Sequence, residues 1–312
     1  MQALLSRWMP IDASAHGPAL DSLTVWVHWV MAILFVGWGA YFIYVLIRFR
    51  AGANPEASYH GAHSHFSSYT EAAVAVVEVV LLVGFAIPAW SMWVTPPAGD
   101  DVFEVRVMGQ QFNWNVHYPG PDGVFGRTDI SLVDDGIVNN IGLDRSDPAA
   151  RDDVFLNNNL YLPVDRDIVV HLSSRDVIHS FSLPQMRVKQ DAIPGMVVPV
   201  HFRPVMTTPP DGRTPACVAG KTCWEIACAQ LCGLGHYRMR GFYQILSQAE
   251  FDDWMAQRQA ELAASLPLLD AAAAPQANAD GAPAVAPTEQ AGEHVHPAGA
   301  QTEHSGGPGS GS

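Results

Sequence analysis

Basic residues are scarce in this sequence of 312 residues, which holds 17 Lys and Arg against 31 Asp and Glu. The resulting formal net charge of −14 at pH 7 argues against a nucleic-acid partner and favours a basic one. The motif Cys-x-x-Cys-His, which attaches c-type haem, does not occur in the sequence. The chain is therefore not expected to carry a covalently attached haem of that type.

Charged side chains are also missing from one long apolar run and nearly missing from a second. Residues 25–47 contain no Asp, Glu, Lys or Arg, and residues 72–94 contain only Glu78, with Pro88 near the end of the run. Each run is long enough to span a bilayer. Trp and Tyr residues lie towards the ends of the first run, where interface anchors are expected. We expect two transmembrane helices, at about 25–47 and 72–94.

Features of a cleavable signal peptide are absent as well. The first apolar run is too long, and no small-residue cleavage site directly follows it. Arg48 and Arg50 do follow it, which places the loop between the two spans in the cytoplasm. The N-terminal segment 1–22, expected to be irregular, and all residues after 95 then lie outside. We expect a multi-pass protein of the bacterial inner membrane, with its soluble domain in the periplasm.

The loop between the spans contains His60, His63 and His65. Three close histidines can bind a metal ion, but this segment offers no cysteine or carboxylate partner. A solvated polar loop is the better prediction.

Glu71 and Glu78 are the acidic residues of the second helix. They are one heptad apart and therefore lie on nearly the same helical face. A carboxylate at membrane depth is costly, so Glu78 is a candidate functional residue that faces protein or water. A glutamate that only hydrogen-bonds a neighbouring helix fits equally well. Glu71 can also be a solvated acid at the helix start, where the helix dipole favours negative charge.

After residue 97 the pattern changes to alternating apolar and polar residues. Residues 102–108 alternate in this way, and strand-like runs recur at 168–172, 197–202, 224–228 and 242–246. Short strands at such intervals predict a β-sandwich or Greek-key barrel over residues 98–262, closed by a helix at 250–262. Residues 263–312 are rich in Ala, Pro, Gly and His and are expected to be a disordered tail.

The segment 228–239 reads C-A-Q-L-C-G-L-G-H-Y-R-M. It places four potential metal ligands at short spacing: Cys228, Cys232, His236 and Met239. Thiolate, imidazole and thioether are the ligand set that redox-active copper favours, whereas a zinc site has no use for a methionine. Gly233 and Gly235 allow the loop to fold back so that these side chains converge. A disulfide between the two cysteines remains an alternative at this point.

Such a copper site still lacks a ligand. The best remaining candidate is His179, in the string R-D-V-I-H-S-F-S-L-P shortly after a strand-like run. Taken alone, a histidine in this position is more often structural. The sequence around His179, taken together with the segment 228–239, favours His179 as the missing ligand.

The strings V-I-H-S-F-S-L-P-Q-M-R-V-K-Q-D-A-I-P-G-M and C-A-Q-L-C-G-L-G-H-Y-R-M-R-G resemble subunit II of the haem–copper cytochrome c oxidases. The resemblance covers roughly residues 23–262. It implies a transmembrane helical hairpin followed by a cupredoxin-like Greek-key sandwich with a dinuclear, mixed-valence copper centre. It further implies that the chain accepts electrons from cytochrome c and passes them to the haem of subunit I, where oxygen is reduced to water. Subunit III is a further implied partner.

Carried over by residue, the resemblance implies that Cys228 and Cys232 bridge two copper ions through their thiolates. His179 and His236 would each bind one of the ions, and Met239 would be a weak axial ligand. The remaining implied ligand is the backbone carbonyl of Gln230.

Three departures from the family pattern stand out. The family commonly has glutamate in place of Gln230, where it helps to hold a magnesium ion at the subunit I interface, so that magnesium site is in question. The tryptophan that receives the electron is replaced by Phe112, with Trp114 two residues on, so the electron entry route can differ. An insertion at residues 204–223 carries Cys217 and Cys223, for which we predict a disulfide in an oxidising compartment.

The family also has a proton-uptake glutamate at the cytoplasmic end of the second span. Alignment on the Ile-Pro pair before residue 89 places Glu71 in that position, with Glu78 as a deeper second candidate.

Residues 100–153 are strongly acidic, with eleven Asp and Glu against four Arg, a net charge of −7. Such a field beside Phe112 and Trp114 would steer a basic electron donor and make its association salt-sensitive. An acidic surface that only confers solubility is the simpler alternative.

Other classes of protein share parts of this pattern. A membrane-tethered copper chaperone of thioredoxin-like type uses Cys-x-x-x-Cys with a distant histidine, but it normally has one span and no following His-x-x-Met. A quinol oxidase subunit II keeps the fold without the copper ligands. The copper centre of nitrous oxide reductase shares the motif but lacks the helical hairpin. The copper chaperone is the principal alternative.

Overall fold

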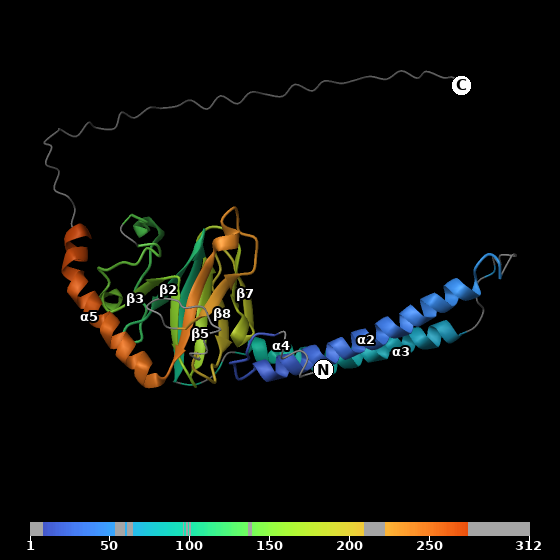
Figure 1. The fold of residues 1–312 in the computed structure, drawn as a ribbon. Coiled ribbons are helices and arrows are strands. Elements are labelled where there is room, and N and C mark those ends of the chain that lie inside the picture. Colours follow the sequence, from blue (N-terminus) through green and yellow to red (C-terminus); the bar gives the residue numbers. More distant parts are fainter. Residues whose placement is uncertain are drawn as a thin grey trace, which may run out of the picture. The chain divides into compact units, whose positions relative to one another are not determined.

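The computed structural model describes residues 9–53, 60, 65–95, 97, 99, 101–136, 139–208 and 222–273. Within these ranges the chain forms two long apolar helices, two five-stranded β-sheets and the helix α5 (Gln248–Ala273) (Figure 1). This arrangement confirms the predicted fold class of a helical hairpin followed by an all-β sandwich. The predicted tail beyond Ala273 and His63 of the inner loop lie outside the described residues.

The first long helix, α2, spans Gly17–Arg48, and the second is built from α3 (Phe66–Leu81), the π-helical η1 (Leu82–Ala86) and α4 (Ile87–Val94). Both are long and apolar enough to cross a membrane, with mean hydropathies of 2.2 and 2.4. The prediction for the first helix was eight residues too short at its start, and residues 17–22 are helical, not irregular. Pro18 lies in the first turn, where its fixed φ favours helix initiation.

The π-helical segment was not predicted, although the sequence carries a signal for it. Pro88 has no N–H to donate and its ring crowds the carbonyl four residues earlier, at Gly84. A π-helical turn next to Pro88 widens the helix at that point, so the chain continues as α4 without ending.

One sheet of the sandwich has the strand order β3-β2-β1-β5-β8, and the other has the order β4-β10-β9-β6-β7. The first sheet comprises β1 (Val102–Gln110), β2 (Asn113–Tyr118), β3 (Val154–Asn157), β5 (Asp167–Ser174) and β8 (Val198–Phe202). The second comprises β4 (Asn159–Pro163), β6 (His179–Leu183), β7 (Val188–Ala192), β9 (Trp224–Cys228) and β10 (Arg240–Leu246). Short 3-10 helices occur at η2 (Ile130–Leu132), η3 (Pro148–Arg151), η4 (Pro184–Met186) and η6 (His236–Arg238).

The core lies between the two sheets, as the alternation of β1 predicted. Phe103, Val105 and Val107 are buried, and Glu104 between them is exposed. Fully burying side chains of this size stabilises the fold by roughly 1.5–3 kcal/mol each.

Five strands, β2, β3, β4, β6 and β7, were missed by the sequence analysis. Strand β2 shows why, since its last five residues are all buried although two of them, Asn115 and His117, are polar. Asn115 accepts a hydrogen bond from Asn140, and His117 is paired with the buried Asp153. The long segment between β2 and β3 therefore buries polar side chains of the strand and removes the alternation that predicts a half-buried strand.

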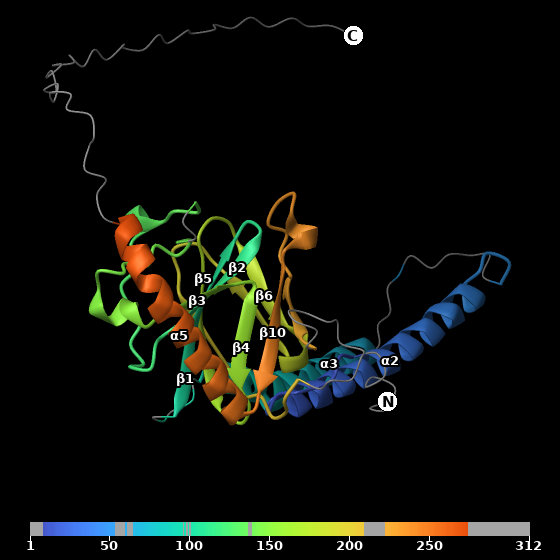
Figure 2. The ribbon, with the colours of Figure 1, turned by 60° about the vertical axis from the view of Figure 1, so that its left-hand side comes forward.

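Helix α5 extends eleven residues beyond its predicted end at 262, so the predicted tail begins too early. The additional residues are rich in Ala and Leu, which favour a helix, and Pro267 is accommodated inside it. Near its start, Phe251 packs against Phe103 at 5.2 Å and Trp254 packs against Tyr161 at 4.7 Å between ring centroids. Figure 2 shows α5 crossing the sandwich beside β1, β3 and β4. These aromatic contacts fix the helix to the sandwich.

The N-terminal segment ties the hairpin to the sandwich. Ala13 donates its N–H to the carbonyl of Gln185, and Ser14 forms a β-bridge with Pro204. Arg187 makes a two-pronged ion pair with Asp21 in α2. The hydrogen bonds to Asp21 raise the pKa of Arg187, whereas burial alone would lower it. Arg187 therefore stays charged.

Candidate metal centre

The predicted ligands meet at one end of the second sheet. Cys228 is the last residue of β9, and the loop that follows carries Cys232 and His236 before β10 begins. His179 is the first residue of β6, which pairs with β9 so that Phe181 lies opposite Cys228. In Figure 1 this loop is the orange segment with the short helix η6 at the end of the sandwich. His179 and Cys228 are 49 positions apart in the sequence, and they are neighbours because β6 pairs with β9.

The distances divide the ligands into two halves. The two cysteine sulfurs are 3.8 Å apart. Cys228 Sγ lies 3.9 Å from His179 Nδ1, whereas Cys232 Sγ lies 3.6 Å from His236 Nδ1 and 3.5 Å from Met239 Sδ. Each sulfur thus has its own histidine.

The backbone carbonyl of Gln230 accepts a hydrogen bond from the Cys228 thiol at 3.3 Å, while the residue itself is exposed. The predicted role for this position uses the carbonyl and leaves the side chain free, and the geometry is compatible with that role.

The spacing of the sulfurs excludes a disulfide and suits a metal. A disulfide requires sulfurs about 2.05 Å apart, and both Cys228 and Cys232 are free thiols here. Two sulfurs that bind the same tetrahedral metal at about 2.3 Å lie roughly 3.8 Å apart. The alternative of a Cys228–Cys232 disulfide is therefore wrong for this structure, and the donor set fits a soft metal ion.

The orientation of His179 is fixed from behind. Asp176 Oδ1 accepts a hydrogen bond from His179 Nε2 at 2.8 Å, and this leaves Nδ1 to face the sulfur. Asp176 Oδ2 in turn accepts the N–H of Gln111 at 2.7 Å. Although partial burial would raise the pKa of Asp176, these hydrogen bonds lower it, so the group stays a carboxylate. Asp176 is a positioning residue that the sequence analysis missed, although it lies only three residues before the histidine.

The metal loop is packed against the turn between β1 and β2. Gln111 Nε2 donates to the carbonyl of Cys232 at 2.6 Å. The ring of Phe112 lies so close to Gly235 that a Cβ there would be 2.4 Å from a ring carbon. Gly233 has a φ of +127°, which a side chain rarely tolerates. The two loop glycines are needed for close approach and for backbone conformation.

The two thiols differ in acidity. Burial alone would raise the pKa of Cys228, but hydrogen bonds to His179 and to the backbone lower it to about 6. Burial, together with the neighbouring Cys228 thiolate, raises the pKa of Cys232 to about 12. Because metals bind the thiolate, Cys228 would already be in its ligating form at neutral pH, whereas Cys232 would have to lose its proton to hold a metal ion.

The two predicted electron-entry residues occupy different places. Phe112 is half-buried beneath the metal loop. Trp114 has 0% exposure, and its ring lies 6.0 Å from that of His179 and 5.4 Å from that of Phe181. Trp114 therefore cannot contact a docked protein directly, and of the two only Phe112 lies near the surface.

Three apolar side chains on the metal loop are strongly exposed, and the sequence analysis missed them. Leu231, Leu234 and Tyr237 are 76%, 97% and 85% exposed. They alternate with the ligands along the loop, so while the ligands turn inward these residues form an apolar rim around the centre. Exposed apolar groups beside a functional site indicate a contact surface.

Most acids of the segment 100–153 make local contacts as well as contributing charge. Asp129, Asp144 and Asp147 accept hydrogen bonds from backbone N–H groups of nearby turns, and Asp153 is buried against His117. Asp135 pairs with Arg175, whose N–H donates to the carbonyl of Gly109 at the end of β1. The last pair lies near the β1–β2 turn that carries Phe112, and there Arg175 neutralises the charge of Asp135.

The remaining predicted residues that the structure describes, Cys223, Glu71 and Glu78, lie away from the metal centre. Cys223 is disulfide-bonded, but Cys217 lies outside the described residues, so their pairing stays a prediction. Glu71 and Glu78 are both on α3 and exposed in the isolated chain, with Glu71 accepting a hydrogen bond from Ser67 at 2.8 Å.

Comparison with known proteins gives consistent results. A family model described as the periplasmic domain of cytochrome c oxidase subunit II matches residues 103–246. The chain is 31% identical over 254 residues to the alternative cytochrome c oxidase subunit 2 of Bradyrhizobium diazoefficiens, covering 81% of this chain and 84% of that protein. It is 26% identical over 270 residues to the cytochrome c oxidase subunit 2 of Cereibacter sphaeroides, covering 80% and 82%.

Among solved structures, the periplasmic domain of subunit II of cytochrome oxidase from Bradyrhizobium japonicum matches with a TM-score of 0.36 and 25% identity, over 54% of this chain and 99% of that chain. The assignment rests on the sequence relatives, which align along most of their own length. The chain therefore belongs to the cytochrome c oxidase subunit II family and forms part of an oxidoreductase complex.

Proposed function

We propose that the chain binds two copper ions in the metal centre and carries electrons from cytochrome c to the haem of oxidase subunit I. The observation that carries this proposal is the division of the ligands into two halves. His179, Cys228 and Cys232 have donor atoms within 4.8 Å of one another, a group that does not include His236. A single ion would leave one histidine unused, whereas two ions that share the thiolates use both.

The family implies copper, and the residues present fit it. When bound, the copper pair supplies a one-electron redox centre. The chain's own residues keep that centre closed: Cys232 is 4% exposed, Met239 is 3% exposed, and the backbone is held by Gln111. A closed and rigid donor set changes little between oxidation states, which favours electron transfer over substrate chemistry.

The rim of Leu231, Leu234 and Tyr237, with Phe112 beneath the same loop, is the proposed docking surface for the donor. An apolar centre beside negative charge suits a cytochrome c that presents a small apolar patch ringed by lysines. The acids of the segment 100–153 would speed the encounter at low ionic strength.

The two apolar helices and the match to a periplasmic-domain family indicate a membrane-anchored protein with a periplasmic domain. We propose the bacterial inner membrane as its location and subunits I and III as its partners there. Glu71, and Glu78 as the second candidate, would supply protons to subunit I from the exposed side of α3. Magnesium binding at Gln230 is not part of the proposal, because an amide is a poorer ligand for a hard cation than a carboxylate.

The test is stopped-flow reduction of the copper-loaded full chain, in detergent, by a reduced basic cytochrome c. We expect fast reduction that slows as ionic strength rises, and loss of reduction in Cys232→Ser. A copper chaperone would instead release its copper to an apo-protein or a moderate chelator within the same time. Release of copper without reduction would overturn the proposal in favour of copper delivery.

A further inference from the structure

A cavity lies at the end of the sandwich opposite the metal centre, where the hairpin meets the sandwich. Its volume is about 490 Å³. Strand β5 runs from Asp167, in the wall of this cavity, to Ser174, which lies opposite Gly109 beside His179. Eight residues of strand separate the two sites by roughly 25 Å. The cavity is therefore independent of the metal centre.

One wall of the cavity is apolar and comes from the hairpin. It is lined by Leu20 of α2 and by Ala89, Trp90, Met92 and Trp93 of α4. These residues occupy the outer ends of the two apolar helices, and tryptophans at such ends lie at the level of the lipid headgroups. The cavity is thus placed where the bilayer surface meets the outer domain.

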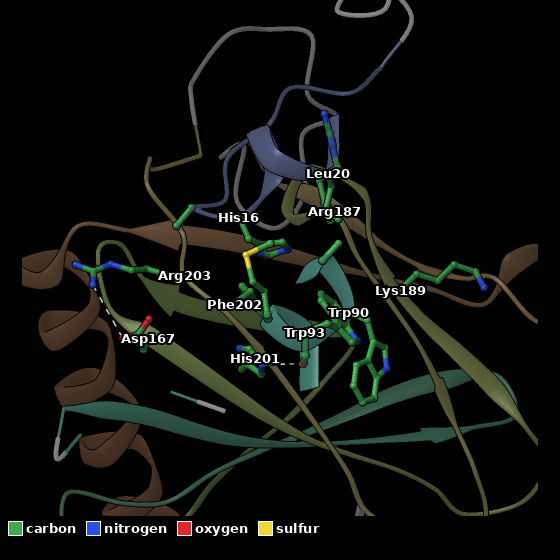
Figure 3. A pocket seen from close by; sticks show the side chains of 13 residues that line it. His16, Leu20, Trp90, Trp93, Asp167, Arg187, Lys189, His201, Phe202 and Arg203 are labelled. Carbon is green, nitrogen blue, oxygen red and sulfur yellow. Dashed lines mark hydrogen bonds and ion pairs between the residues drawn. The ribbon is translucent and has the colours of Figure 1, made fainter. Parts of the chain in front are cut away.

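The opposite wall is cationic and comes from the sandwich. Lys189 of β7 is exposed and has no ion-pair partner among the described residues. Arg203 is also exposed and lies 4.0 Å from Asp167, the limit of an ion pair. Figure 3 shows Lys189 and Arg203 on opposite sides of the cavity, with Trp93 and His201 between them. Both charged ends point outward in opposite directions, so two weakly neutralised cations flank the apolar cavity.

One polar atom beside the cavity is left unsatisfied. His16 packs edge-on against Trp93 at 5.7 Å, and its Nε2 is buried without a hydrogen-bond partner. His201, by contrast, is hydrogen-bonded to the carbonyl of Trp93 at 2.8 Å. A buried polar atom without a partner is costly, and a polar group entering the cavity would remove that cost.

We propose that this cavity holds one anionic phospholipid of the outer leaflet. The phosphate would lie at the cavity mouth beside Lys189, Arg203 would add positive charge on the other side, and the acyl chains would run along Trp90 and Met92 into the bilayer. An apolar wall alone would accept any lipid. The two cations, of which only Arg203 lies near a carboxylate, add selectivity for a negatively charged headgroup.

Native mass spectrometry of the copper-loaded full chain in detergent tests this assignment, with phosphatidylglycerol and phosphatidylcholine as probes. We expect one phosphatidylglycerol to bind about tenfold more tightly than phosphatidylcholine. The double variant Lys189→Gln/Arg203→Gln should remove that preference, and Ala89→Trp, which fills the cavity, should weaken binding of both lipids. Arg258→Gln, which removes a cation of α5 outside the cavity, is the matched control and should behave like the parent.

Equal binding of the two lipids by the parent chain would overturn the proposal, as would an unchanged preference in the double variant. Competition by millimolar inorganic phosphate would show that the site takes a free anion and would equally overturn it. An unchanged copper spectrum in each variant verifies that the fold is intact.

Discussion

The metal centre and the helical hairpin differ in how much of their function one chain contains. At the metal centre every proposed ligand comes from this chain, and Asp176 and Gln111 hold two of the ligating segments in place. On the hairpin, Glu71 and Glu78 are exposed, and within the part of α3 that the structure describes Glu71 contacts only the nearby Ser67 with its side chain. The proposed redox site is therefore prebuilt in this chain, whereas the proposed proton pathway would require a partner subunit.

The largest expected effect concerns the reactivity of the prebuilt site without metal. In the copper-free chain the pKa of Cys228 is about 6, against an ordinary value of 9.0. Because the thiolate is the reactive form, alkylation by iodoacetamide should proceed above about pH 6 and decline as pH falls through that value. Peptide mapping after alkylation measures the midpoint at each cysteine.

Cys232, whose pKa is raised to about 12, is the internal control and should react slowly at neutral pH. Equal reactivity of the two cysteines at pH 7 would contradict the asymmetry of the site.

The next effect concerns the positioning of His179. Asp176→Asn keeps an acceptor for the histidine but removes the charge that favours its ligating orientation. We expect copper affinity to fall by about 10- to 100-fold in competition with a chelator. Asp147→Asn, which alters a carboxylate at η3 without touching a ligand, should leave the affinity unchanged. If both variants bind copper alike, Asp176 has no positioning role.

Substitution of the two hairpin glutamates tests whether the hairpin and the metal centre act independently. In the assembled oxidase, Glu71→Gln should slow turnover about tenfold if it delivers protons, while reduction of copper by cytochrome c stays unchanged. Glu78→Gln is the matched variant one heptad deeper. A slow Glu78→Gln with a normal Glu71→Gln would reverse the assignment, and slowed copper reduction in either variant would contradict the separation of the two regions.

The smallest expected effect lies at the rim of the metal loop. Leu234→Ser removes the side chain with the highest exposure of the three rim residues and should lower the association rate with cytochrome c about three- to tenfold. Its effect on stability should stay within about 0.5 kcal/mol because the residue is exposed. The control is Val205→Ser, which alters an exposed residue at the end of the sandwich next to the hairpin. Equal association rates for both variants would place the docking surface elsewhere.

The candidate ligands could be proposed from the sequence because the side chains of Cys228, Cys232, His236 and Met239 lie in one short loop, and the structure brings these side chains close together. His179 was harder to assign, since only strand pairing brings it to Cys228. Asp176 and the apolar rim were missed because a positioning role or an exposed face depends on the fold of the loop. Strand β2 was missed because its buried polar residues, such as His117, have partners far away in the sequence.

The cavity at the hairpin end could not be predicted at all. Its walls come from helix ends and from strands that lie at least 74 residues further along the chain, from Trp93 to Asp167, and no motif connects them. The extension of α5 to Ala273 was hidden for a different reason, because an Ala-rich composition is compatible with both a helix and a disordered tail.

The most direct test of the central claim is a count of copper ions in the full chain together with its electron paramagnetic resonance spectrum. We expect two copper ions per chain, one unpaired electron coupled equally to both nuclei, and loss of this signal in Cys232→Ser. A single copper ion with a signal from one nucleus, unchanged in Cys232→Ser, would contradict that claim.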